Sequence, residues 1–227
     1  MRIRWCRLFH EVWILFKKDL LQEFRSKAAI NAIFLFSIVT LTAVSYSIGS
    51  HAISDFILAA LLWIVIVFSA LSAFSHIFLK EEEAQTADTL KLIAQPTPIF
   101  LSKWLFNTLL LTLLLMVIVP LFVGVFNFQV KNMPLLLLSI FLGDIGLASG
   151  GTIVAALIAK ASRRGALFSV LSFPILLPVM VVGISAAQIA FTQEGSPLFP
   201  SEITALFAYD VVLFTTSLML FDFIWND

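Results

Sequence analysis

Residues 56–96 read FILAALLWIVIVFSALSAFSHIFLKEEEAQTADTLKLIAQP: a long run without Asp, Glu, Lys or Arg, followed at once by the most polar stretch of the chain. An α-helix rises about 1.5 Å per residue, so about 20 apolar residues cross a hydrocarbon core about 30 Å thick. The run 56–79 is long enough to do so. It predicts a transmembrane helix, and the polar stretch after it predicts a segment at one membrane surface.

Apolar runs of this kind recur along the whole chain, which is 60% hydrophobic and only 12% charged. Such a composition excludes a disordered chain and argues against a soluble globular domain. The runs lack the period-two alternation of barrel strands, so they predict helices. The fold class expected is an all-α polytopic membrane protein, with residues 1–227 as a single membrane domain. Its six predicted transmembrane helices are 28–48, 56–79, 104–126, 134–159, 165–190 and 203–224.

The positive charges are distributed very unevenly between the two sides of this membrane protein. Thirteen of the 14 Lys and Arg residues lie before the first predicted span, between spans two and three, or between spans four and five. The other side has only Lys131. Positive residues are retained in the cytoplasm, so both termini and the Glu-rich stretch are predicted to be cytoplasmic. A multi-pass protein of the bacterial inner membrane is expected.

The segment before the first span, residues 1–27, has an amphipathic pattern. Apolar side chains at spacings of three and four form one helical face, and charged ones lie mostly on the other, as in an interfacial helix of the cytoplasmic headgroup layer. Trp5 and Trp13 are its expected anchors. The apolar face comprises Trp5, Phe9, Val12, Phe16, Leu20 and Phe24. A soluble helix packed on a partner remains the alternative.

The polar stretch lies within the cytoplasmic segment 80–103 between spans two and three. Its acidic start suits the N-terminal turn of a helix, and Pro96 is predicted to end that helix. A short amphipathic helix of this kind is suited to docking into a groove on a soluble partner, whereas a solvated helix lying on the membrane is the other interpretation. The candidate docking residues are Glu81, Glu82, Glu83, Ala87, Leu90 and Ile93.

Asp144 falls near the middle of the fourth predicted span and is the candidate intramembrane polar site. A carboxylate at that depth is costly unless it is protonated, paired or in contact with water. Its helix carries rows of Gly and Ala, including Gly146 and Gly150, so Asp144 is expected to face other helices. A structural hydrogen-bond acceptor and a place on a substrate path are both left open. Asp210 and Asp222 are expected to be solvated near the two ends of the last span.

The residues of an enzyme or a resident cofactor site are not apparent. Cys6 is the only cysteine, and the chain has no Gly-rich phosphate-binding loop with Lys. His51, on the predicted outer side, could in principle ligate haem iron, but a solvated loop histidine is the expected interpretation. We expect no catalytic residues, no bound cofactor or metal, and no nucleic-acid partner.

Four stretches together resemble the haem exporter protein B family, the ABC-2-like membrane subunit of the cytochrome c maturation transporter. They are KKDLLQEFRSKAAIN (17–31), LKEEEAQTADTLKLIAQPTPIFLSKW (79–104), LGDIGLASGGTIVAAL (142–157) and SRRGALFSVLSFPILLPVMV (162–181). The last stretch is the most specific, because it combines a basic turn with Pro174 and Pro178. Two positions depart from the family pattern: a Gly is usual near Thr86–Ala87, and a neutral residue is usual where Asp144 lies.

The resemblance implies a permease subunit that docks a separate ATP-binding subunit at residues 81–95. It further implies a haem-handling membrane protein and a periplasmic haem chaperone as partners, with lipid around the spans and a homodimer left open. ATP would bind the partner subunit, and haem would be the transported or delivered substrate. Two alternatives are an ABC-2 permease for a lipid, polysaccharide or drug, and a membrane assembly scaffold that does not transport.

Overall fold

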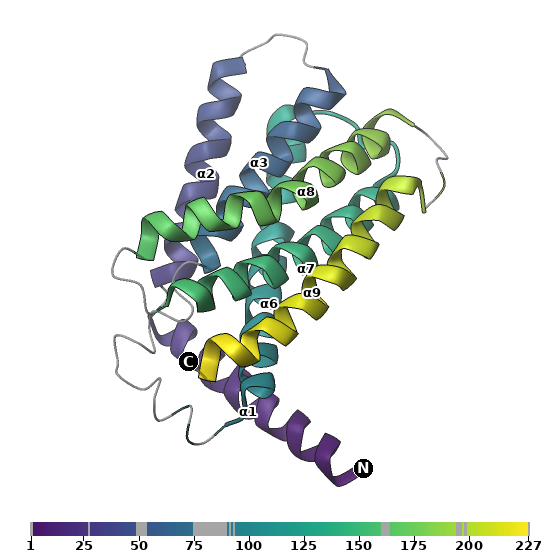
Figure 1. Ribbon diagram of the computed structural model, residues 1–227. Coiled ribbons are helices and arrows are strands. Elements are labelled where there is room, and N and C mark those ends of the chain that lie inside the picture. Colours follow the sequence, from purple (N-terminus) through teal and green to yellow (C-terminus); the bar gives the residue numbers. More distant parts are fainter. Residues whose placement is uncertain are drawn as a thin grey trace.

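A computed structural model describes the chain except residues 1, 27, 49–53, 75–89, 91, 93, 160–163, 194–196, 198 and 227 (Figure 1). Its regular elements are all helices. They are α1 (Arg2–Ser26), α2 (Ala28–Ile48), α3 (Asp55–Phe74), α6 (Pro96–Phe126), α7 (Met133–Ile158), α8 (Arg164–Thr192) and α9 (Ser201–Asn226). The all-helical prediction is therefore confirmed for the described part of the chain.

Five of these helices are long and apolar enough to cross a membrane: α3, α6, α7, α9 and residues Val170–Thr192 of α8. α7, α8 and α9 match predicted spans to within two residues at both ends. α3 begins one residue before the second predicted span, and the end of that span falls on residues outside the description. α2 has the predicted bounds of the first span, but only Ser37–Tyr46 qualifies as an apolar helix among its described residues. A sixth span at α2 stays a prediction.

α6 differs most from its prediction, because it begins at Pro96 and not at Trp104. Gln95 is extended, and Pro96 occupies the first helical turn, where a missing N–H costs nothing. The polar residues before Trp104 are therefore the first two turns of a helix of 31 residues. At 1.5 Å per residue this helix is about 46 Å long, so it extends beyond a hydrocarbon core about 30 Å thick.

α7 lies among the other helices and is the most buried span, packing on α8, α9, α6 and α3. Its glycines make this close packing possible. A methyl group on Gly143 would come within 2.1 Å of the Trp63 ring of α3, and one on Gly151 within 2.2 Å of Phe74. The prediction that the small residues of this span face other helices is confirmed.

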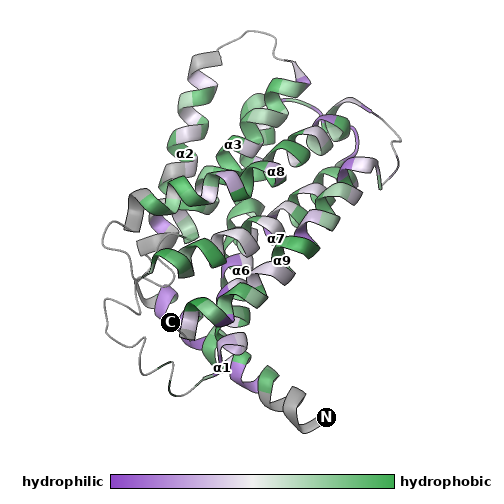
Figure 2. Cartoon of the chain, viewed as in Figure 1, coloured by the Kyte–Doolittle hydropathy of each residue, from purple (hydrophilic) through white to green (hydrophobic). Residues whose placement is uncertain are grey.

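Both chain ends lie at the same end of the helical bundle (Figure 1). At the opposite end, the α6–α7 connection packs on the end of α8. The backbone N–H of Asn132 donates to the carbonyl of Ala190, and Lys131 Nζ donates to the last-turn carbonyl of Thr192. Green, apolar segments dominate the helices in Figure 2, while hydrophilic residues gather on parts of α1 and near the helix ends.

Candidate functional site

Most of the predicted docking helix cannot be placed, because Glu81, Glu82, Glu83, Ala87 and Ile93 lie outside the described residues. Four residues near its end are described: Leu90, Leu92, Ala94 and Gln95. There the N–H of Ala94 donates to the carbonyl of Leu90, and both side chains pack on the hydrophobic core of the chain itself. Leu92 points outward and is 88% exposed. Of the described apolar residues in this turn, Leu92 is the one available to a partner.

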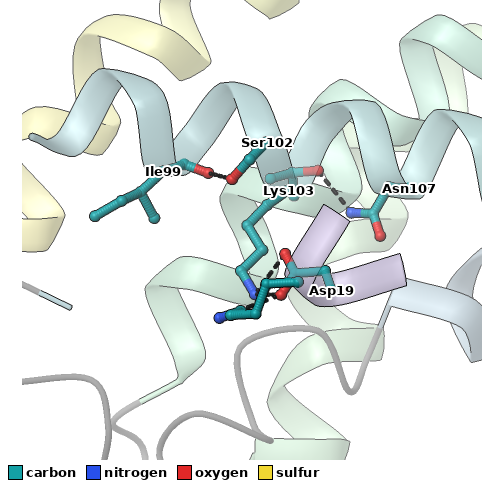
Figure 3. Close-up of polar contacts among 7 residues, drawn as sticks. Asp19, Ile99, Ser102, Lys103 and Asn107 are labelled. Carbon is teal, nitrogen blue, oxygen red and sulfur yellow. Dashed lines mark hydrogen bonds and ion pairs between the residues drawn. The ribbon is translucent and has the colours of Figure 1, made fainter. Parts of the chain in front are cut away.

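The first turns of α6, directly after this segment, are joined to α1 by a buried ion pair (Figure 3). Lys103 Nζ lies 3.1 Å from each carboxylate oxygen of Asp19, and only 3% of Lys103 and 7% of Asp19 is exposed. Lys18 Nζ also lies 3.3 Å from Asp19 Oδ1. A buried charge is tolerated when it is paired in this way, so the contact fixes α1 against α6.

Sequence analysis did not identify this pair, although part of the signal was present. Val12, Phe16, Asp19 and Glu23 are spaced at three and four residues, which places the two acids on the apolar face of α1. Both acids are buried. Lys103 is 84 residues from Asp19 in sequence, and no local pattern identifies it as the partner.

The rest of α1 agrees only in part with the predicted amphipathic pattern. Val12, Phe16 and Leu20 pack inward, but Phe9 and Phe24 of the same predicted face are exposed. Trp13, a predicted anchor, is 63% exposed. The helix therefore has one side on α6 and apolar side chains on its open side, which suits a helix in contact with both protein and headgroups.

Asp144 lies in α7 and is 1% exposed, so the prediction that it faces other helices is confirmed. The hydroxyl of Thr112 in α6 donates to Oδ2 of Asp144. Oδ1 is buried and has no hydrogen-bond partner among the described residues. The carboxyl group is thus only half satisfied within this chain.

A groove of about 650 Å³ runs between α6 and α7, and Asp144 and Thr112 lie at its deep end. Its walls are otherwise apolar and include Met116 and Phe141, which are more than half exposed. The groove reaches Gly124 and Met133, at the ends of the two helices that the α6–α7 connection joins. A volume of this size accommodates a drug-sized ligand or a set of helix side chains.

The prediction that Asp210 is solvated is wrong. Asp210 is 3% exposed and lies against Gly146 of α7, where a methyl group would come within 2.3 Å of Oδ1. The inference failed because the sequence position of Asp210 near a helix end does not show how the neighbouring helices cover it. Asp222, in contrast, is exposed as expected.

Further polar contacts join the N-terminal half of α6 to the C-terminal half of α7. Trp104 Nε1 donates to Ser149 Oγ at 3.0 Å, and Asn107 Nδ2 donates to Thr152 Oγ1 at 2.7 Å. Interhelical hydrogen bonds of this kind stabilise packing inside a membrane. In the described part of the chain, no group of three or more His, Cys, Asp or Glu residues is arranged to hold a metal ion.

Residues 10–221 match the model of the CcmB protein family. The chain belongs to the CcmB family. Two curated proteins named heme exporter protein B are similar to this CcmB family member. The one from Pseudomonas aeruginosa is 29% identical over 154 residues, which cover 64% of this chain and 67% of the relative. The one from Haemophilus influenzae is 27% identical over 176 residues, which cover 77% and 80%.

The CcmB assignment does not by itself give a role to any residue above. The roles of the docking residues and of Asp144 stay predictions. What the structure adds is the start of α6, which is joined to α1, and the groove between α6 and α7 with its half-satisfied acid.

Proposed function

We propose that this chain is the membrane permease subunit of an ABC transporter complex that supports haem export in the maturation of c-type cytochromes. The observation that carries the proposal is the match to the CcmB family over nearly the whole length of the chain. The names of the two heme exporter relatives give the substrate class. The apolar helices support a multi-pass membrane protein.

In this proposal a separate subunit binds and hydrolyses ATP and docks on the cytoplasmic segment 80–95. Of the described residues, only Ala94, in a bend, and the extended Gln95 separate the helical residues of that segment from Pro96, the first residue of α6. A displacement of the segment would therefore act directly on a helix that crosses the membrane. The Asp19–Lys103 pair would make α1 move with α6.

The ATP-driven motion would serve the release of a haem-loaded periplasmic chaperone, passed on with a haem-handling membrane protein. Such a role needs no haem ligand on this chain. It needs an inner surface for the ATP-binding subunit and an outer surface that changes shape. The packed α6–α7 and α7–α8 contacts offer a continuous connection between the two ends.

Leu92→Asp tests the docking surface, because a charged side chain in a desolvated contact costs several kcal/mol. We expect normal membrane abundance, loss of the ATP-binding subunit from affinity purification, and loss of covalent haem from c-type cytochromes. Gln95→Asp is the matched control: Gln95 is exposed and polar, and Asp is a good residue before a helix. Leu90→Asp should also lower stability, because Leu90 packs on the chain itself.

The docking proposal is contradicted if Leu92→Asp retains the ATP-binding subunit. It also fails if the subunit is lost while c-type cytochromes mature normally.

The proposed orientation, with both termini in the cytoplasm of a bacterial inner membrane, has its own test. Cys6 and cysteines introduced at Thr86 and Ser162 should be protected from an impermeant thiol reagent in intact cells. Cysteines at Ser54 and Ser196 should react. Labelling of position 86 or 162 from outside would overturn the six-span topology.

A further inference from the structure

The groove between α6 and α7 combines two features that α6 and α7 by themselves leave unexplained. At its deep end, Asp144 Oδ1 is buried without a partner among the described residues. At its outer end, Gly124 has no described atom within 4 Å of the position where a side chain would begin. The other glycines tested in this way each pack against a side chain of a neighbouring helix.

Each feature carries a cost that a binding partner would remove. A buried carboxyl oxygen without a hydrogen bond is expensive in an apolar environment. A glycine inside a helix is less favourable than alanine by about 1 kcal/mol, and in membranes such a residue typically lets another helix approach closely. In the described part of this chain, no group donates a hydrogen bond to Asp144 Oδ1 and no side chain packs against Gly124.

A third feature lies between these two ends. Pro120 has no N–H, so the carbonyl of Met116, one turn earlier, lacks its helical partner, and both residues line the groove. The residues of this otherwise apolar wall thus include a buried acceptor, Asp144 Oδ1, and a backbone carbonyl that Pro120 leaves without its helical partner. The occupant of the groove must be apolar along its length and must bring a donor at the depth of Asp144.

The dimensions favour a helix as the occupant. The lining residues of α6 run from Thr112 to Gly124 at spacings of three and four, and those of α7 run from Met133 to Asp144 in the same way. The row of lining residues on each helix is three helical turns, or about 17 Å, long. Two antiparallel helices with side chains spaced in this way form a groove into which a third helix can pack its side chains. A saturated acyl chain would fill the space but would bring no donor to Asp144.

We propose that the α6–α7 groove is a docking site for a transmembrane helix of another protein that carries an Asn, Gln or hydroxyl side chain at mid-depth. That side chain donates to Asp144 Oδ1, and the backbone of the helix approaches α6 at Gly124. A second copy of this chain fits less well. All copies have the same orientation in the membrane, so two grooves packed face to face would bring two Asp144 carboxyls together at the same depth.

The experiment uses the full-length protein in lipid vesicles and a defined probe. The probe is a synthetic Leu–Ala transmembrane helix of about 23 residues with one Asn at its centre, and the control peptide has Leu there. Energy transfer between labelled peptide and labelled protein measures association. One interhelical hydrogen bond should favour the Asn peptide by about three- to tenfold.

Asp144→Leu should abolish this preference, whereas Asp144→Asn, which keeps a hydrogen-bonding group, should retain it. Gly124→Leu should weaken binding of both peptides by closing the outer end. Equal binding of the two peptides to the wild-type protein would overturn the proposal, as would a preference that persists in Asp144→Leu.

A photocrosslinking residue at Leu137 in the groove, compared with one at Met219 on the exposed face of α9, identifies the occupant in cells. The proposal requires an adduct with another polypeptide at position 137 that disappears in Asp144→Leu. An adduct with lipid alone, or one of twice the mass of this chain, contradicts it. These outcomes do not involve the cytoplasmic docking segment, so they are independent of the proposed function.

Discussion

The contacts of the two halves of α6 treat buried charges in different ways. In the N-terminal half, Lys103 is paired with Asp19, and Asn107 and Trp104 bond to α7. In the C-terminal half, Thr112 bonds to Asp144 of α7, whose second oxygen has no described partner, beside a groove that ends at Gly124. The charge in the N-terminal half is paired within the chain, which suits a rigid connection, although Asn107 Oδ1 has no described partner. The C-terminal half borders an open groove and a half-satisfied acid, which suits a surface completed by another molecule.

The largest effect that this comparison predicts is in the N-terminal half of α6. Lys103→Met leaves Asp19 buried without its main cation, and breaking a buried pair costs about 3–5 kcal/mol. We expect a strong fall in the apparent melting temperature of the purified protein and lower membrane abundance. Scanning fluorimetry of the tryptophans measures the first, and quantitative immunoblotting the second.

The double variant Asp19→Asn/Lys103→Met is the matched control for this prediction. It removes both charges, so it should recover much of the lost stability. If the double variant is as unstable as the single one, the pair does not stabilise the α1–α6 contact through its charges.

An intermediate effect is expected at the glycines. Gly143→Ala places a methyl group 2.1 Å from the ring of the fully buried Trp63, and overpacking of this kind costs about 1–3 kcal/mol. Gly124→Ala meets open space and should be neutral or stabilising by up to about 1 kcal/mol in the isolated subunit. Thermal unfolding in one detergent compares the two. A fall of similar size in both would show that the groove is already filled by this chain.

The smallest effect is predicted at Asp144 in the isolated subunit. Asp144→Asn keeps the shape and the acceptor for Thr112, so the free energy of unfolding should change by less than about 1 kcal/mol. Asp144→Leu should cost more, because it removes that acceptor and adds bulk beside the small residues of α7. Chemical denaturation in mild detergent measures both. Complete loss of function in Asp144→Asn at normal abundance would indicate that a charge is required there.

The helices could be predicted from sequence because their signal is local. A run of about 20 apolar residues is sufficient, and the bounds of α2 and α7 were predicted within a residue. The start of α6 could not be found in this way. Hydropathy detects the membrane core, whereas Pro96–Lys103 is polar in part and belongs to the helix outside that core.

The candidate site was less predictable, because it depends on residues far apart in sequence. Asp144 was identified by its depth in an apolar run, but its partner Thr112 lies 32 residues away and has no special pattern. Asp210 was misjudged for the same reason, since it lies against Gly146 of another helix. Pro120, which lies inside α6 and lines the groove, was not singled out from the sequence.

Covalent haem on c-type cytochromes, measured by in-gel haem staining in cells that lack this chain, tests the proposed function most directly. We expect the staining to be lost while b-type haem proteins stay normal and haem remains on the periplasmic chaperone. The wild-type chain and Gln95→Asp should restore it, and Leu92→Asp should not. Normal staining in the absence of the chain would contradict the proposed function.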